Sequence, residues 1–176
     1  MNRALIIILA SAALAGCETG GGGAPGPSSG PMYAPNSGAG AEAFRAEDFA
    51  WSQASGGGEV DGVVAYKTGY TCTGGTVVLT PETPWSRARM RTMYNSDSGS
   101  AMSVGDVHPA PAEHATEYQQ YARRTTCDAN NAFRFTGLPS GAWFVVTVAT
   151  PTGGGDKVAI MRRVVTNGGV VSLKLQ

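Results

Sequence analysis

The stretch 131–150, NAFRFTGLPSGAWFVVTVAT, constrains the fold of this chain more than any other part of it. Phe133 and Phe135 alternate with polar neighbours, glycine and proline interrupt the pattern at 137–141, and a run of aromatic and β-branched residues follows. This order predicts a hairpin, with a strand, a tight turn and a second strand. Both faces of the second strand are apolar, so we expect it to be central or to be covered on one side by the segment 95–125.

Short strand-like segments bounded by turn residues occur on both sides of this stretch. They are 59–66, 76–83, 88–94, 117–128, 156–166 and 168–176. No segment has the pattern of a long helix. The sequence therefore predicts the all-β class, as an antiparallel β-sandwich of about seven strands.

Three parts of the predicted β-sandwich allow more specific predictions. Gly62 interrupts the first strand, which is typical of an edge strand or a bulge. In the last strand Val171, Leu173 and Leu175 share one face, a pattern typical of a half-buried antiparallel strand. Residues 95–116 show no strand pattern, so we expect a long mobile loop there.

The N-terminus has the features of a bacterial secretion signal. Arg3 supplies positive charge, and 4–14 is an apolar run too short to span a bilayer as a helix. The run ends in LAGC at 14–17, which resembles the lipobox of bacterial lipoproteins. The resemblance implies cleavage before Cys17, a diacylglycerol thioether on its sulfur and a fatty-acylated (palmitate-type) amino terminus. The alternative is an ordinary signal peptide in which the cysteine occurs by chance.

The same resemblance implies a cellular location. A lipid-anchored protein of this kind belongs to the bacterial cell envelope, facing the periplasm or the cell surface. Glu18 follows the cysteine, where an Asp tends to retain lipoproteins in the inner membrane. Glu18 therefore favours the outer membrane.

Glycine, proline and serine dominate the residues after the signal, as in GGGGAPGPSSGP. Such a segment has too little apolar surface to offset the entropy of ordering, so we expect a disordered, flexible tether. Phe44, Phe49 and Trp51 then form a weak apolar stripe, which either is a short helix docked on the domain or belongs to the tether. The predicted organisation is a signal peptide at 1–16, a lipidated tether at 17–58 and a β-sandwich domain at 59–176.

Four motifs follow one another in the C-terminal segment. They are Val60-Asp61-Gly62, TVVLTP at 76–81, a turn led by Asp128, and FRFTGLPSGAWFVVTV at 133–148. This order resembles the carboxypeptidase regulatory-like domain, although Asn131 replaces the usual turn Gly and Trp143 the usual Tyr. The resemblance implies an Ig-like or transthyretin-like sandwich that is non-catalytic and associated with envelope adhesion or carbohydrate.

The chain has three cysteines. With Cys17 assigned to the lipid, Cys72 and Cys127 remain as a pair in an oxidising compartment, where a disulfide is the expected state. Such a bond contributes roughly 4 kcal/mol by restricting the unfolded chain. A metal-binding pair or two reactive thiols are the alternatives.

His108, Glu113 and His114 lie in one proline-rich segment. Histidine and carboxylate together can bind zinc, and histidine can act as a general base. No third group, nucleophile motif or metal-ligand spacing accompanies them, so a solvated loop is the preferred interpretation. We predict no catalytic residue, no metal ligand and no cofactor.

Ligand-binding residues are sought among the exposed aromatic and basic side chains. Trp85 follows Pro84 in a predicted loop and is the better candidate for a sugar-stacking surface, whereas Trp143 is expected in the core. Arg89 and Arg91 would add an anion grip beside Trp85. The alternative is a solvated face whose arginines pair with local acids.

The formal net charge is zero and 15% of residues are charged, so no strong field favours nucleic acid. Our first hypothesis is a lipid-anchored, non-enzymatic envelope protein whose sandwich is a structural or protein-interaction module. The alternative is a carbohydrate- or cell-wall-binding module. The expected partners are the membrane, through the lipid, and an envelope protein or glycan.

Overall fold

The computed structural model describes residues 43–110 and 112–176. The predicted signal peptide, Cys17 and most of the predicted tether lie outside the described residues. The elements in chain order are η1 (Ala46–Gln53), β1 (Gly58–Val64), β2 (Tyr70–Thr71), β3 (Thr76–Pro81), α1 (Pro84–Tyr94), β4 (Gly99–Ser103), η2 (Val104–Asp106), α2 (Ala115–Gln119), β5 (Arg123–Thr126), β6 (Ala132–Leu138), β7 (Gly141–Pro151), β8 (Val158–Thr166) and β9 (Val170–Leu175).

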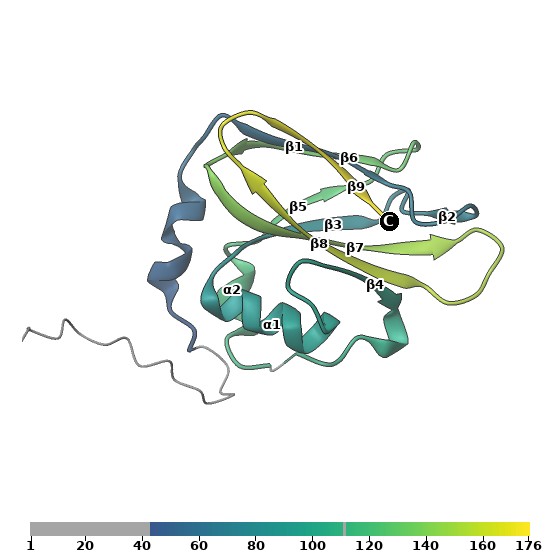
Figure 1. The fold of residues 1–176 in the computed structure, drawn as a ribbon, viewed down its shortest axis with the longest axis horizontal. Coiled ribbons are helices and arrows are strands. Elements are labelled where there is room, and N and C mark those ends of the chain that lie inside the picture. Colours follow the sequence, from purple (N-terminus) through teal and green to yellow (C-terminus); the bar gives the residue numbers. More distant parts are fainter. Residues whose placement is uncertain (1–42, 111) are drawn as a thin grey trace, which may run out of the picture. The chain divides into compact units, whose positions relative to one another are not determined.

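The strands form two sheets, which confirms the all-β sandwich (Figure 1). One sheet has the order β6-β1-β9, and the larger sheet has the order β4-β8-β7-β3-β5, with β2 paired to β7. All of these strand pairs are antiparallel except β1 and β9, which run parallel. The antiparallel expectation for the last strand is therefore wrong, because alternation specifies which face is buried and not the direction of the neighbour.

The stretch 131–150 forms a strand, a turn and a strand, as expected, but not a paired hairpin. β6 belongs to the three-stranded sheet and β7 to the larger one, so the turn crosses from one sheet to the other. Gly137 has φ 68°, and the following Leu138 and Pro139 are buried. Burial of the turn directs the chain across the core instead of back along the same sheet.

The main core lies between the two sheets. Trp143 and Val145 of β7 point inward, together with Phe133 and Phe135 of β6. The predicted core position of Trp143 is confirmed. Gly62 lies on the central strand of the small sheet, not at an edge, and the ring of Phe133 covers it.

The disulfide between Cys72 and Cys127 is confirmed. Its Cα atoms lie 5.7 Å apart, and both residues are buried in the main core. Asn131, in the turn before β6, has φ 61°. Its Oδ1 accepts hydrogen bonds from Thr71 Oγ1 (2.6 Å) and from the backbone N–H of Cys72 (2.9 Å), which links this turn to the disulfide region.

The residues 88–94 are helical, as part of α1, and the predicted strand there is wrong. Thr83 accepts a hydrogen bond from Ser86 N (3.1 Å), and the Ser86 hydroxyl accepts one from Thr83 N (2.8 Å). This capping box, with Pro84 in the first turn, is a strong helix start. A six-residue alternation is too short to exclude a helical period.

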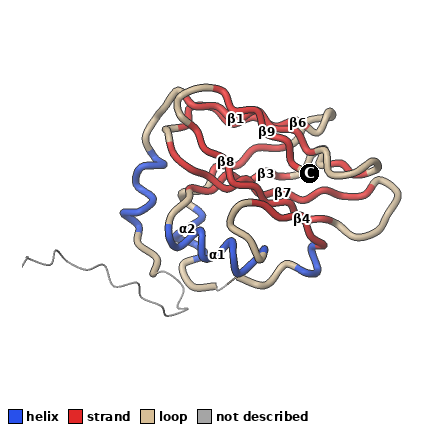
Figure 2. The backbone as a smooth tube through the Cα atoms, viewed as in Figure 1, coloured by secondary structure: helices blue, strands red, loops and turns tan. Residues whose placement is uncertain are grey.

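The outer face of the larger sheet is covered by α1 (Figure 2). Phe144 and Met161 of the sheet pack against Met90 and Tyr94, which lie four residues apart on the helix. β7 is both central and covered on its outer side. The explanation that β7 is central is therefore correct, whereas its cover is the helix at 84–94, with Met102 and Val107 of the segment 95–125 packed beside it.

The predicted strand at 117–128 and the predicted loop at 95–116 are also corrected. Only 123–126 is a strand, while 115–119 is a short helix whose Tyr118 is buried. The expected loop contains β4, which pairs with the edge of β8, and η2. β4 is an edge strand of mostly small, half-buried residues with one large apolar side chain, Met102, so its sequence carries no alternation of apolar and polar residues.

Residues 46–53 form the docked helix and not a piece of tether. The helix is η1, and its Phe49 is buried in a cluster with Trp85 and Tyr118. The packed domain therefore includes residues N-terminal to position 59.

Candidate functional site

The residues predicted to bind a ligand lie on α1, and Trp85 is not an open platform. Its exposed fraction is 8% because Phe44 and Phe49 cover it. The Arg89 guanidinium lies over the Trp85 ring at 5.3 Å, so its cation stacks on a ring of the domain's own cluster. The expectation of a surface Trp85 is wrong because a helix replaced the predicted loop.

Arg91 lies in a network of ion pairs. It donates to Asp97, with 2.6 Å between Nη2 and Oδ2, and this bond lowers the pKa of the Asp97 carboxyl. Arg87 bridges Asp97 (3.5 Å) and Glu82, and Glu82 also accepts from Arg163. The Glu82 side chain is only 6% exposed, so two arginines compensate a buried carboxylate.

Glu82, Arg87 and Arg91 of this network line a depression of about 480 Å³ beside the start of α1. Each arginine of the network contacts a carboxylate, so most of the positive charge is compensated. The arrangement matches the alternative of arginines paired with local acids better than an anion grip.

The predicted histidine group does not converge on a site. His114 Nδ1 lies 2.5 Å from Glu117 Oε2, and its ring stacks on Phe44 at 4.8 Å. Glu113 is 3.6 Å from His114 Nε2, and His108 is exposed elsewhere in the segment. Within 43–110 and 112–176, no three His, Cys, Asp or Glu side chains are arranged to hold a metal.

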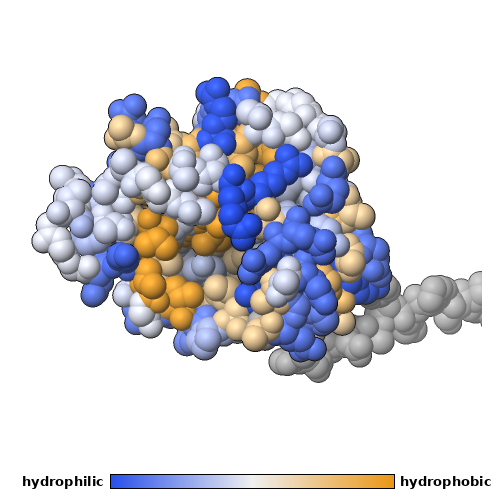
Figure 3. Space-filling model, turned by 180° about the vertical axis from the view of Figure 1, so that it is seen from behind, coloured by the Kyte–Doolittle hydropathy of each residue, from blue (hydrophilic) through white to orange (hydrophobic). Residues whose placement is uncertain are grey.

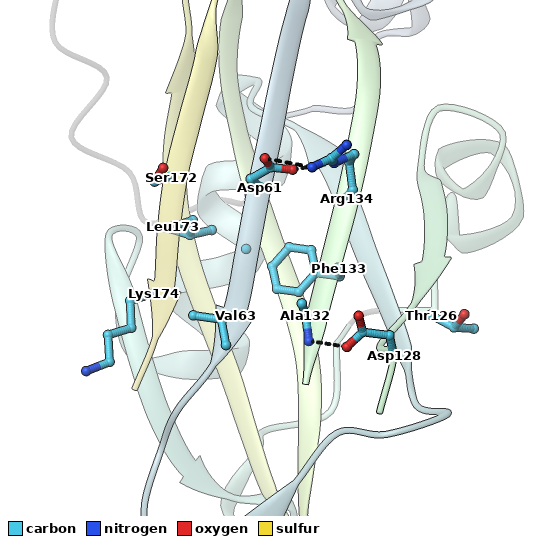
Figure 4. A pocket seen from close by; sticks show the side chains of 11 residues that line it. Asp61, Val63, Thr126, Asp128, Ala132, Phe133, Arg134, Ser172, Leu173 and Lys174 are labelled. Carbon is cyan, nitrogen blue, oxygen red and sulfur yellow. Dashed lines mark hydrogen bonds and ion pairs between the residues drawn. The ribbon is translucent and has the colours of Figure 1, made fainter. Parts of the chain in front are cut away.

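A groove of about 700 Å³ lies on the three-stranded sheet (Figure 4). Strand alternation sends Val60 and Val64 of β1 into the core, so Asp61 and Val63 point to the opposite, solvent-facing side. Arg134 of β6 is the cross-strand partner of Asp61, and Ser172 of β9 pairs with Asp61 on its other side. Three neighbouring strands thus bring a carboxylate, a guanidinium and a hydroxyl into one row.

Asp61 and Arg134 form the centre of the groove. Arg134 donates from Nε (2.6 Å) and Nη2 (3.0 Å) to the two oxygens of Asp61, and its Nε lies 3.2 Å from Glu59. The hydrogen bond and charge of Asp61 raise the pKa of Arg134. The fork geometry orients both groups, as a polar recognition site requires.

The remaining side chains complete a polar rim around a small apolar floor. Val63 is 37% exposed and lies between Lys174 and Ala132 on the neighbouring strands. Lys174 has no ion-pair partner among the described residues, and Figure 4 shows it pointing away from the sheet. Asp128 closes the far side, where its Oδ1 accepts from Ala132 N (2.8 Å). Two carboxylates and two cations among the lining residues, Asp61, Asp128, Arg134 and Lys174, balance in charge.

Sequence reasoning did not identify this groove. The alternating pattern over β1 does place Asp61 on an outer face, which is a usable signal. The pairing of β1 with β6 and β9 depends on contacts across more than 70 residues of sequence, which alternation cannot reveal.

The surface also carries apolar residues. Val104, Val148, Val165 and Val170 are exposed in addition to Val63, and Figure 3 shows an apolar patch among hydrophilic residues on the rear face. Patches of this kind are typical of contact surfaces between proteins when they are large.

No protein-family model matches the sequence, and no curated protein matches it. The fold is similar to the crystal structure of a protein from Pseudomonas aeruginosa that is named as a candidate carbohydrate-binding protein. The TM-score is 0.54 at 19% sequence identity, and the alignment covers 74% of this chain and 97% of the other. Identity this low shows a shared fold and nothing about the ligand.

In the described part of the chain, no helix has both the length and the hydrophobicity needed to cross a membrane.

Proposed function

We propose that this protein is a lipid-anchored, non-catalytic binding module of the bacterial cell envelope, with a carboxypeptidase regulatory-like domain. The observation that carries the binding role is the oriented Asp61–Arg134 pair at the centre of an open groove. The anchor rests on the lipobox-like LAGC at 14–17. A module of this kind needs no reacting group, only a positioned polar surface.

A neutral glycan is the ligand class that the groove suits best. Sugar hydroxyls both donate and accept hydrogen bonds, so they can bridge a carboxylate and a guanidinium that are already paired. The charge balance of the lining residues disfavours polyanions, and Val63 offers an apolar contact for a sugar ring.

Calorimetric titration with neutral and acidic envelope oligosaccharides tests the binding role. We expect a neutral oligosaccharide to bind, and Arg134→Ala to weaken it at least tenfold because two groove donors are lost. Asp156→Ala is the matched control, since this exposed aspartate lies in the β7–β8 turn. If no oligosaccharide binds, or if both variants bind equally, the glycan site is wrong.

The anchor has its own test. Cys17→Ser removes the sulfur that would carry the lipid, so the protein should lose label from radioactive palmitate. A variant that keeps the label would contradict lipidation at Cys17.

A structural or protein-interaction module is the second candidate. The apolar surface in Figure 3 and the exposed valines favour it. Crosslinking in cells followed by mass spectrometry would distinguish it, because a stoichiometric protein partner is expected only for this candidate.

A further inference from the structure

The N-terminal arm, defined as residues 43–55, inserts an aromatic side chain into the domain. Phe49 is fully buried. Its ring stacks on Tyr121 at 4.8 Å and meets Tyr118 at 6.0 Å and Trp85 at 6.3 Å. These three rings form a recess that the arm fills.

Two further rings of the arm occupy neighbouring positions. Phe44 lies 4.8 Å from the ring of His114 and packs on Trp85 at 5.3 Å. Trp51 lies 4.9 Å from Trp143, in space left by Gly141, where a Cβ would fall 2.2 Å from the Trp51 ring. Phe44 and Phe49 stack on one another at 5.3 Å in a shared aromatic cluster, and Trp51 enters a second site beside Trp143. Three anchors spaced over eight residues thus enter two neighbouring sites, which resembles a peptide bound in a groove.

Backbone pairing with the sheets does not hold the arm. It belongs to neither sheet. Arg123 Nη2 donates a hydrogen bond to Ser52 O (3.0 Å), and just beyond the arm Gly56 N donates one to Gly137 O (3.3 Å). The arm itself is a 3-10 helix of eight residues, a length that is uncommon because the hydrogen-bond geometry is poor. The aromatic recess, not local structure, therefore determines where the arm lies.

We propose that the recess also accepts the arm of a second copy, so that two copies exchange arms and form a dimer. Every anchor contact in the exchanged dimer equals one in the monomer, since the two chains are identical. Only the link at 54–57 must change direction. In the monomer the arm has a high effective concentration at its own recess. Exchange is therefore favoured at high protein concentration, or when the link at 54–57 is too short for the arm to reach the recess of its own chain.

Shortening the link tests the proposal. Ala54 and Ser55 are exposed, so their deletion removes no buried side chain while it brings the arm about 7 Å short of its site. We expect the full chain with this deletion, in mild detergent, to be a dimer by light scattering. Adding Phe44→Ala to the deletion should weaken that dimer at least tenfold. In the deletion variant the monomer cannot place its own arm in the recess, so the contacts of Phe44 exist only in the dimer.

The unaltered chain provides a second measurement that does not depend on the deletion variant folding. Two differently tagged copies are unfolded in urea and refolded together at increasing concentration. Co-isolation of the two tags that rises with concentration is expected. The proposal is overturned if the refolded wild-type chain is monomeric at every concentration, or if the deletion variant folds as a monomer.

Discussion

The ring of Phe133 lies over Gly62, so that a Cβ added to Gly62 would fall 2.0 Å from the ring. The two residues are direct cross-strand partners on β6 and β1. The ring fills the space that a side chain on the central strand would occupy. An aromatic ring that covers a strand glycine in this way compensates for the packing that the glycine lacks.

Gly62→Ala should therefore destabilise the domain. The added methyl group must displace a buried ring, which costs about 1–3 kcal/mol in a packed core. Urea denaturation measures the free energy of unfolding. Gly153→Ala is the control, because no atom lies within 4 Å of the Cβ position there, and equal stability of the two variants would contradict the packing argument.

Removal of the disulfide by Cys72→Ala with Cys127→Ala should lower the free energy of unfolding by roughly 4 kcal/mol, through the entropy gained by the unfolded chain. The bond closes a segment with a sequence separation of 55 residues. Chemical denaturation with and without reductant checks the value. Cys17→Ser, outside the described domain, should leave this free energy unchanged.

Stability should fall at high pH because of Tyr118. Burial raises the pKa of this phenol to about 12 from its ordinary value of 10.0. Between these two values the unfolded chain loses the proton while the folded chain keeps it, so the folded state is fully favoured below pH 10 and loses stability as the pH rises towards 12. The loss is on the order of 2–3 kcal/mol. Between pH 9 and about 12, the free energy of unfolding should depend less on pH in Tyr118→Phe than in the unaltered protein. An equal pH dependence in the two proteins would count against Tyr118 as the cause.

Arg123 joins the two sheets and the N-terminal arm at one edge of the sandwich. Its guanidinium donates to the carbonyls of Thr136, Gly137 and Ser52, and it lies 5.6 Å from the Trp143 ring. Because the half-buried carbonyl of Ser52 loses its donor, together with the exposed carbonyls of Thr136 and Gly137, Arg123→Ala should lower the free energy of unfolding by about 1–2 kcal/mol.

Arg124→Ala is the matched control for this prediction. Arg124 is the exposed neighbour on β5, and its side chain points to the opposite face of the strand. Thermal unfolding of both variants gives the comparison. An equal loss of stability in the two variants would show that removal of a positive charge, and not loss of the hydrogen bonds to the carbonyls, destabilises the domain.

The sequence alone was sufficient to predict features that depend on local residue patterns or on the chemistry of individual residues. Alternation placed Phe133 and Leu175 on buried faces, and both lie in the main core. The even cysteine pair predicted the bond between Cys72 and Cys127. These features need no knowledge of which strand lies beside which, because side chains alternate with period 2 in any sheet.

The tertiary structure decided everything that depends on neighbours. The seven residues at 88–94 fit either a strand or a helix period, and the helix cap at Thr83 with the burial of Met90 selected the helix. That helix, together with Phe49 of the arm, removed Trp85 from the surface. The groove exists because β1 lies between β6 and β9, an arrangement set by the whole chain's packing and not by any one segment's pattern.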